Sequence, residues 1–219
     1  MTAQMGLLLS AIAFVGSHFF LSHPMRRLLV RGVGERPFLG IYSLVAILTF
    51  GSMIYFYARI GREAPLWVAG DGLWLFATFL MWLGSILFVG SFVRNPALPS
   101  ARVARDIRPV GVFAITRHPM MWGFASWAIV HLIVVGTPKS LVLDGAILLL
   151  ALAGSVGQDR KKQALMGERW HEWTAQTAFI PFSRGVANPG LVATVGGTLL
   201  FLIATWVHPM PAGFWRWIA

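Results

Sequence analysis

The sequence contains no cysteine and few charged residues, and both shortages narrow what the chain can be. Without cysteine, disulfides, thiolate metal ligands and cysteine nucleophiles are excluded. Charged residues make up 12% of the 219 residues, about half the share typical of a soluble domain. Apolar residues make up 57% of the chain, and its mean hydropathy is +0.69. These values predict an integral membrane protein whose environment is a lipid bilayer.

Six apolar stretches are marked off by charged ends, at residues 5–21, 38–58, 72–93, 119–136, 141–156 and 191–207. Each approaches or reaches the roughly 20 residues that a helix needs to cross the hydrocarbon. Helices are expected because lipid offers backbone polar groups no hydrogen-bond partner. The fold class predicted is all-α, a polytopic transmembrane helical bundle with about six spans, forming one domain over residues 1–219. The first stretch lacks a basic region before it, so we expect a span there and not a cleaved signal peptide.

The positive charges are unevenly distributed between the two sides of the predicted membrane domain. Lys and Arg number 18 against 8 Asp and Glu, which gives a net charge of +10. Fourteen of the 18 lie in the connections that follow the first, third and fifth stretches. By the positive-inside rule these connections are cytoplasmic, and both termini are non-cytoplasmic. The charge is therefore read as a topology signal, and nucleic acid is not expected as a partner. The segment 167–173 reads as an amphipathic interfacial helix with its tryptophans toward lipid.

Acidic residues are nearly absent from the apolar stretches, and Asp144 alone comes close, near one end. This excludes paired carboxylates for acid–base catalysis and a carboxylate-bound pair of metal ions. The chain also has no HExxH motif and no glycine-rich phosphate loop. Histidine is the residue type left for chemistry within the membrane, where ionisable groups are functional candidates by default.

Three of the six histidines are placed to act inside the membrane. His18 and His131 lie within spans, and His118 opens the fourth span with Pro119 in the first turn. We interpret His23, His171 and His208 as solvated at the interfaces. Neutral imidazole is the commonest metal ligand, and an apolar pocket between helices suits haem iron. The alternative is that each buried imidazole only forms a hydrogen bond to a neighbouring helix.

The motif Arg117-His118-Pro119 followed by His131, together with Gly16-Ser17-His18 and Arg26-Arg27, resembles the NnrU family of membrane proteins. That family is related to the zeta-carotene isomerases of plants and cyanobacteria. The resemblance implies haem b with His18 and His131 as axial ligands to the iron, and His118 as a further site residue.

Pairing of His18 with His118 stays open, because both lie near the cytoplasmic side of the membrane. His131 lies thirteen residues, about 20 Å, further along the helix than His118. The guanidinium groups of Arg26, Arg27 and Arg117 are expected to hold the haem propionates. One departure from the plant enzymes is Ala128, where they have a cysteine three residues before the second ligand.

The function that this resemblance implies is cis–trans isomerisation of a carotenoid-like polyene, or a redox or nitric oxide-related role of the haem. The expected partner is a hydrophobic small molecule or a gas within the inner membrane of a bacterium, and the chain is also compatible with a homo-oligomer.

One alternative rests on Arg117-His118-Pro119 and Asp159, which resemble the isoprenylcysteine carboxyl methyltransferases and imply S-adenosylmethionine as cofactor. A second is a non-enzymatic factor for nitrite or nitric oxide reduction.

Overall fold

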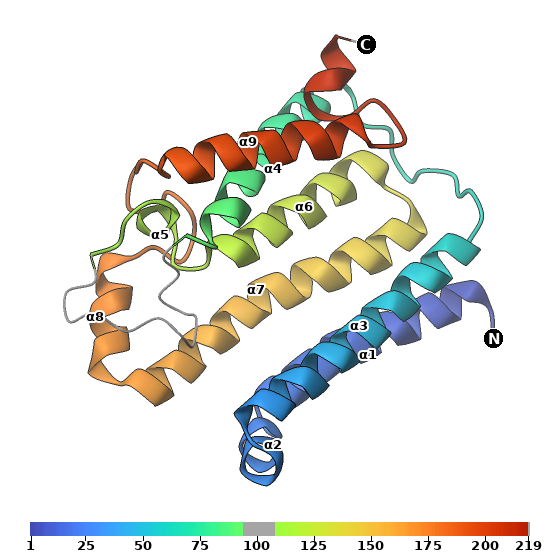
Figure 1. The fold of residues 1–219 in the computed structure, drawn as a ribbon. Coiled ribbons are helices and arrows are strands. Elements are labelled where there is room, and N and C mark those ends of the chain that lie inside the picture. Colours follow the sequence, from blue (N-terminus) through green and yellow to red (C-terminus); the bar gives the residue numbers. More distant parts are fainter. Residues whose placement is uncertain (94–107, 219) are drawn as a thin grey trace.

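The computed structural model describes residues 1–93 and 108–218, and every regular element in this part of the chain is a helix (Figure 1). Their order is α1 (Ala3–Ser22), α2 (Arg26–Val33), α3 (Glu35–Arg59), α4 (Asp71–Gly90), α5 (Val112–Ile115), α6 (Pro119–Val135), α7 (Pro138–Met166), α8 (Glu168–Gln176), α9 (Leu191–Trp206) and the short 3-10 helix η1 (Gly213–Trp217).

The helices confirm the predicted membrane bundle. Among the described residues, α1, α3, α4 and α7 are long and apolar enough to cross a bilayer, and α6 and α9 are shorter apolar helices. The bounds of α7 differ most from those predicted, because this helix of 29 residues continues through the charged segment 159–162. At its start, the side chain of Thr137 accepts a hydrogen bond from the backbone N–H of Ser140, and the side chain of Ser140 accepts one from the backbone N–H of Thr137. Pro138 lies in the first turn. The helix α2 was not predicted.

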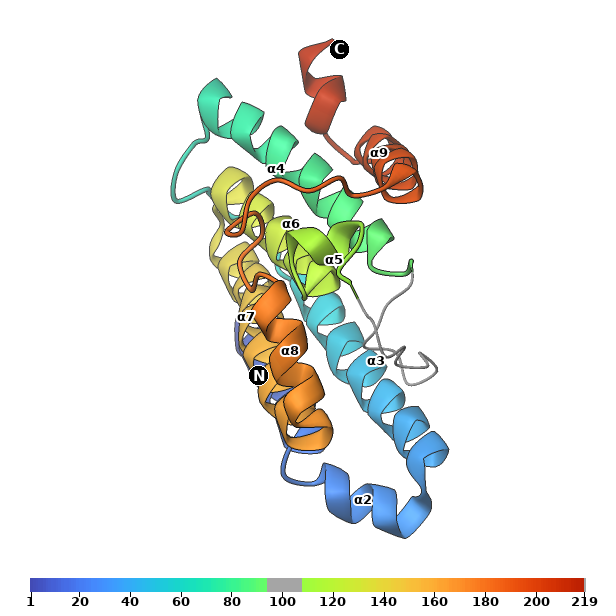
Figure 2. The same cartoon turned by 90° about the vertical axis from the view of Figure 1, so that its left-hand side faces the viewer.

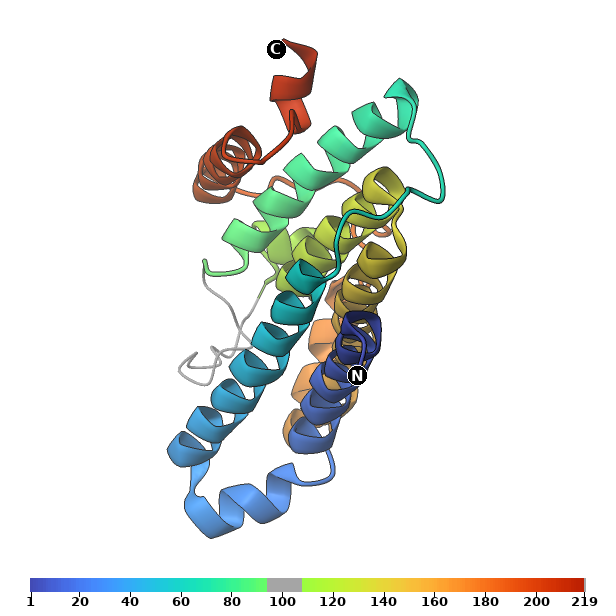
Figure 3. The same cartoon turned by 90° about the vertical axis from the view of Figure 1, so that its right-hand side faces the viewer.

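The long helices pack in a row, in the order α3, α1, α7, α6, α4 and α9 (Figures 1 and 2). Extensive contacts join each helix to the next one in this row. Among the described helices, α3 and α4, which stand near the two ends of this row, do not pack extensively against each other (Figure 3).

Helices α4 and α6 approach closely because small residues face each other across their contact. A Cβ atom added to Gly84 would lie 2.6 Å from the Cβ atom of Ser126, and one added to Gly123 would lie 3.0 Å from the carbonyl oxygen of Gly84. Helix association in lipid depends on such close packing, because burying apolar side chains gains little there.

Most of the basic residues that the structure describes gather at one end of the bundle, around α2, the start of α6 and the junction of α7 with α8 (Figure 1). Both termini lie toward the opposite end (Figure 1). Arg94, Arg102 and Arg105 lie outside the described residues. This arrangement agrees with the charge pattern of the sequence, while the orientation relative to the cytoplasm stays a prediction.

The tryptophans of the segment 167–173 point inward, so the prediction that they face lipid is wrong. The exposed fractions of Trp170 and Trp173 are 6% and 7%. Both belong to a core with Val112 and Phe113, beneath α5. The amphipathic helix α8 does form, but its apolar face packs against residues of α4, α5 and α9 and not against lipid.

The close approach of α4 and α6 gives the first prediction. Gly84→Ala is expected to lower the free energy of unfolding by about 1–3 kcal/mol, because the new methyl group forces the helices apart. Gly145→Ala on α7 is the matched control, because a Cβ atom there meets nothing within 4 Å. It should raise stability by about 0.5–1 kcal/mol through reduced backbone freedom. Thermal unfolding in detergent measures both, and equal shifts would contradict the packing described.

Candidate functional site

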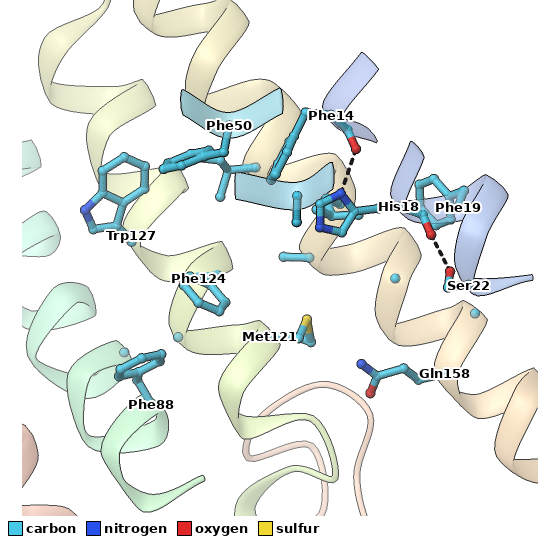
Figure 4. A pocket seen from close by; sticks show the side chains of 18 of the residues that line it. Phe14, His18, Phe19, Ser22, Phe50, Phe88, Met121, Phe124, Trp127 and Gln158 are labelled. Atoms are coloured by element: carbon cyan, nitrogen blue, oxygen red, sulfur yellow. Dashed lines mark hydrogen bonds between the residues drawn. The ribbon is translucent and has the colours of Figure 1, made fainter. Parts of the chain in front are cut away.

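A cavity of about 780 Å³ lies between the helices of the bundle, within the size range of small-molecule sites (Figure 4). Its walls come from α1, α3, α4, α6 and α7, with a small contribution from α9. Most lining side chains are apolar, and several are aromatic: Phe14, Phe19, Phe50, Phe88, Phe124 and Trp127. Such walls suit a flat or elongated apolar molecule, because aromatic faces make large dispersion contacts.

His18 presents an imidazole to this cavity from α1 (Figure 4). Its Nδ1 atom lies 2.7 Å from the carbonyl oxygen of Phe14. A carbonyl can only accept a hydrogen bond, so Nδ1 carries the proton and Nε2 is left with its lone pair. The rings of Phe14 and Tyr42 pack against the imidazole edge-on, with centroids 4.5 Å and 5.3 Å away. The backbone partner and the two aromatic rings therefore hold the imidazole of His18 in one orientation, with Nε2 able to accept a bond from a ligand.

The other polar groups that line the cavity come from α1 and the residue after it, from α3, from α4 and from α7. They are Ser22, His23, Tyr42, Ser85, Gln158 and Lys161. Four of these, Ser22, His23, Gln158 and Lys161, lie toward the basic end of the bundle. The sequence analysis missed Gln158 and Lys161. Their spacing from Gly154 and Gly157 places all four on one face of α7, which is the signal that could have found them.

His131 lies on α6 beside Trp127, which does line the cavity. Its Nδ1 atom donates to the carbonyl oxygen of Trp127 at 2.8 Å, and its ring stacks on the indole of Trp127 with centroids 4.1 Å apart. His131 is not among the cavity's lining residues, and its other ring neighbour among the described residues is His208. The structure thus brings His131 to His208, and ligation of one iron by His18 and His131 stays a prediction.

His118 is buried in an ionic network, with an exposed fraction of 4%. Its Nε2 atom lies 2.9 Å from Oδ1 of Asp159, and Nη2 of Arg117 lies 2.6 Å from Oδ2 of the same carboxylate. Arg117 also donates from its backbone to the carbonyl of Ala178 and from Nη1 to that of Thr177. This network joins the start of α6 to α7 and to the loop after α8, and it occupies the Nε2 atom of His118.

The three arginines predicted to hold propionates lie outside the cavity lining. Arg117 is engaged by Asp159. Arg26 forms an ion pair of 2.6 Å with Glu35 and lies over the ring of Phe38. Arg27 is exposed on α2. The cation that does line the cavity is Lys161.

Comparison with known proteins adds two findings. The chain matches the family described as NnrU protein over residues 6–215. It is also 23% identical over 158 residues to the protein named 15-cis-zeta-carotene isomerase, chloroplastic, of Arabidopsis thaliana, and 24% identical over 159 residues to the protein of the same name from Zea mays. Each alignment covers 69% of this chain and 42% of the plant protein. No solved structure matches. Because the family match extends over nearly the whole chain, this protein belongs to the NnrU family.

Proposed function

We propose that this membrane protein binds a long conjugated hydrocarbon in its cavity and isomerises it between cis and trans forms, with haem b bound at His18. The observation that carries the proposal is a cavity with aromatic walls into which one imidazole presents a free ring nitrogen. The likeness to plant proteins named as 15-cis-zeta-carotene isomerases supports the choice of a polyene. This chain spans about two fifths of the length of those relatives.

The cavity favours a hydrocarbon for two physical reasons. Each apolar group of a ligand that leaves water or a headgroup region for this cavity gains dispersion contacts with Phe50, Phe88 and Phe124. Helices α3 and α4 both line the cavity, and among the described residues they do not pack extensively against each other, so we expect the side between them to face the bilayer. A substrate dissolved in lipid can enter there without crossing water.

The residues around His18 fit haem b. The Nε2 atom of His18 would hold the iron, Phe14 and Tyr42 fix the ring that carries it, and Lys161 at the polar end would pair with a propionate. When bound, haem supplies redox and ligand-exchange chemistry that protein side chains lack. With His118 engaged by Asp159 and His131 outside the cavity, His18 would act alone. A haem held by one histidine would be able to exchange its other ligand, which the proposed reaction would require.

The methyltransferase alternative is less well supported by the same geometry. Its cofactor would require free donors and acceptors on Arg117, His118 and Asp159. In this structure these three side chains bind each other, and the guanidinium contacts the carboxylate through two nitrogens. The network acts as a structural tie between α6 and α7.

The role of His18 predicts a spectroscopic change. The full chain, purified in detergent and supplied with haem, should show a Soret band and reduced α and β bands. His18→Ala should weaken haem binding by about 10–100-fold, because the iron loses its imidazole. His171→Ala, which replaces an exposed histidine on α8, is the control and should bind haem like the parent. Equal haem binding in both variants would contradict the assignment.

Filling the cavity should block the substrate. A Cβ atom meets nothing within 4 Å at either Gly154 or Gly145 on α7, but only Gly154 is among the residues lining the cavity. Gly154→Phe is expected to reduce polyene isomerisation in liposomes at least about tenfold, because the phenyl ring occupies apolar ligand volume. Gly145→Phe should retain the parent rate. Chromatography of the isomers measures both, and equal rates would contradict this binding site.

The ionic network should prove structural. Asp159→Asn removes the charge that compensates Arg117 and is expected to destabilise the protein by about 3 kcal/mol. Haem content per folded molecule should stay unchanged, because His18 does not contact Asp159. Thermal unfolding and the absorption spectrum separate the two effects. A stable variant that lost binding of S-adenosylmethionine would instead support the methyltransferase alternative.

A further inference from the structure

The helix α2 runs across the basic end of the bundle, whereas its neighbours α1 and α3 run along it (Figures 2 and 3). It joins the end of α1 at Ser22 to the start of α3 at Glu35. None of its eight residues is buried, and its main packing among the described helices is against α1 and α3. Because α1 and α3 are each long and apolar enough to cross a bilayer, they hold both ends of α2 at the membrane surface.

The residues of α2 divide into a basic and an apolar face. Arg27 and Arg31 are four residues apart and therefore lie on one face of the helix. Leu29 and Val33 are also four apart and lie on the opposite face. The bundle does not cover the apolar residues, since the exposed fractions of Leu28 and Val33 are 62% and 45%. Cationic amphipathic helices of this kind lie in the membrane interface, with their apolar face toward the acyl chains.

The positive charge of α2 is only partly compensated by the described protein. Arg26 forms an ion pair with Glu35, but α2 itself contains no acidic residue. Arg27 and Arg31 are exposed, and neither forms a hydrogen bond or an ion pair with residues 1–93 or 108–218. Two guanidinium groups on one face of α2 are therefore available to a ligand.

This combination of groups fits a ligand with an anionic part and an apolar part. A guanidinium can donate two parallel hydrogen bonds to one phosphate group. The apolar side chains gain free energy when they leave water for the boundary of the acyl chains. A soluble anion would satisfy Arg27 and Arg31 but leave Leu28 and Val33 in water, whereas a phospholipid would satisfy both pairs.

We propose that α2 binds anionic phospholipids, with Arg27 and Arg31 on the phosphate groups and Leu28 and Val33 against the acyl chains. A leaflet that contains anionic lipids has a negative surface potential, which attracts basic segments beside a membrane span. A zwitterionic lipid offers the same phosphate, but its own cationic group balances the charge, so the attraction is weaker.

The lipid site is independent of the proposed function. None of the residues of α2 lines the cavity. The proposal also gives a ligand to Arg27, which lies outside the cavity and so is not placed to hold a haem propionate there. It would stand if the cavity bound neither haem nor polyene.

The test titrates the full chain in detergent with phosphatidylglycerol or phosphatidylcholine and counts bound lipids by native mass spectrometry. The parent should bind phosphatidylglycerol at least about fivefold more tightly than phosphatidylcholine. The double variant Arg27→Gln, Arg31→Gln should bind phosphatidylglycerol at least about fivefold more weakly, because each basic residue near an anionic surface contributes about that factor. The control is Arg59→Gln, Arg62→Gln, which removes two exposed arginines near the opposite end of α3 and should bind like the parent.

Equal phosphatidylglycerol affinity of the parent and the Arg27, Arg31 variant would overturn the proposal. Equal affinity of the parent for the two lipids would do the same, and displacement of phosphatidylglycerol by inorganic phosphate would assign the arginines to a soluble anion. Added salt should weaken phosphatidylglycerol binding by the parent. This measurement needs no variant, and binding that is independent of salt would also contradict the proposal. Haem binding at His18 should be the same in parent and variant, so the lipid and haem proposals can fail separately.

Discussion

An ionisable side chain that is buried must find its partner within the protein, and this constraint organises the structure around α6 and α7. Asp159 accepts from both Arg117 and His118, and Arg117 donates further to the loop after α8. These bonds fix the start of α6 against α7, which lines the cavity along one face. The imidazoles of His18 and His131 meet the same constraint differently, because each donates Nδ1–H to the carbonyl four residues earlier.

That local hydrogen bond has a chemical consequence. An imidazole bonded through Nδ1 to its own helix holds Nε2 away from the backbone, in the tautomer that can bind a metal. His18 directs this nitrogen into an apolar cavity, whereas His131 lies beside His208. The two histidines that the sequence grouped into one site thus have different neighbours, and their ligation of one iron stays a prediction.

Much of the fold could be predicted from the sequence because the bilayer imposes it. Long apolar runs between charged ends predict the six apolar helices. The concentration of arginine and lysine in alternate connections predicts which end of the bundle is basic. The helix α2 and the inward tryptophans of α8 were missed, because amphipathic periodicity does not say whether the partner of an apolar face is lipid or protein. Trp170 and Trp173 are buried by α5 and its neighbours, which are distant in sequence.

The site was predicted only in part for a similar reason. His18 could be found because imidazole is rare within spans. The aromatic walls could not, since residues facing lipid and residues facing a cavity have the same composition. The pairing of His131 with His208 depends on how the segment after α9 folds back, which no local pattern reveals.

The central claim is that the cavity converts a polyene between its cis and trans forms. Its most direct test is to reconstitute the haem-loaded, reduced protein in liposomes containing a 15-cis polyene and to measure the isomer ratio by chromatography over time. The account predicts that the trans form accumulates faster than in liposomes without protein. An isomer ratio identical to that of the protein-free liposomes would contradict it.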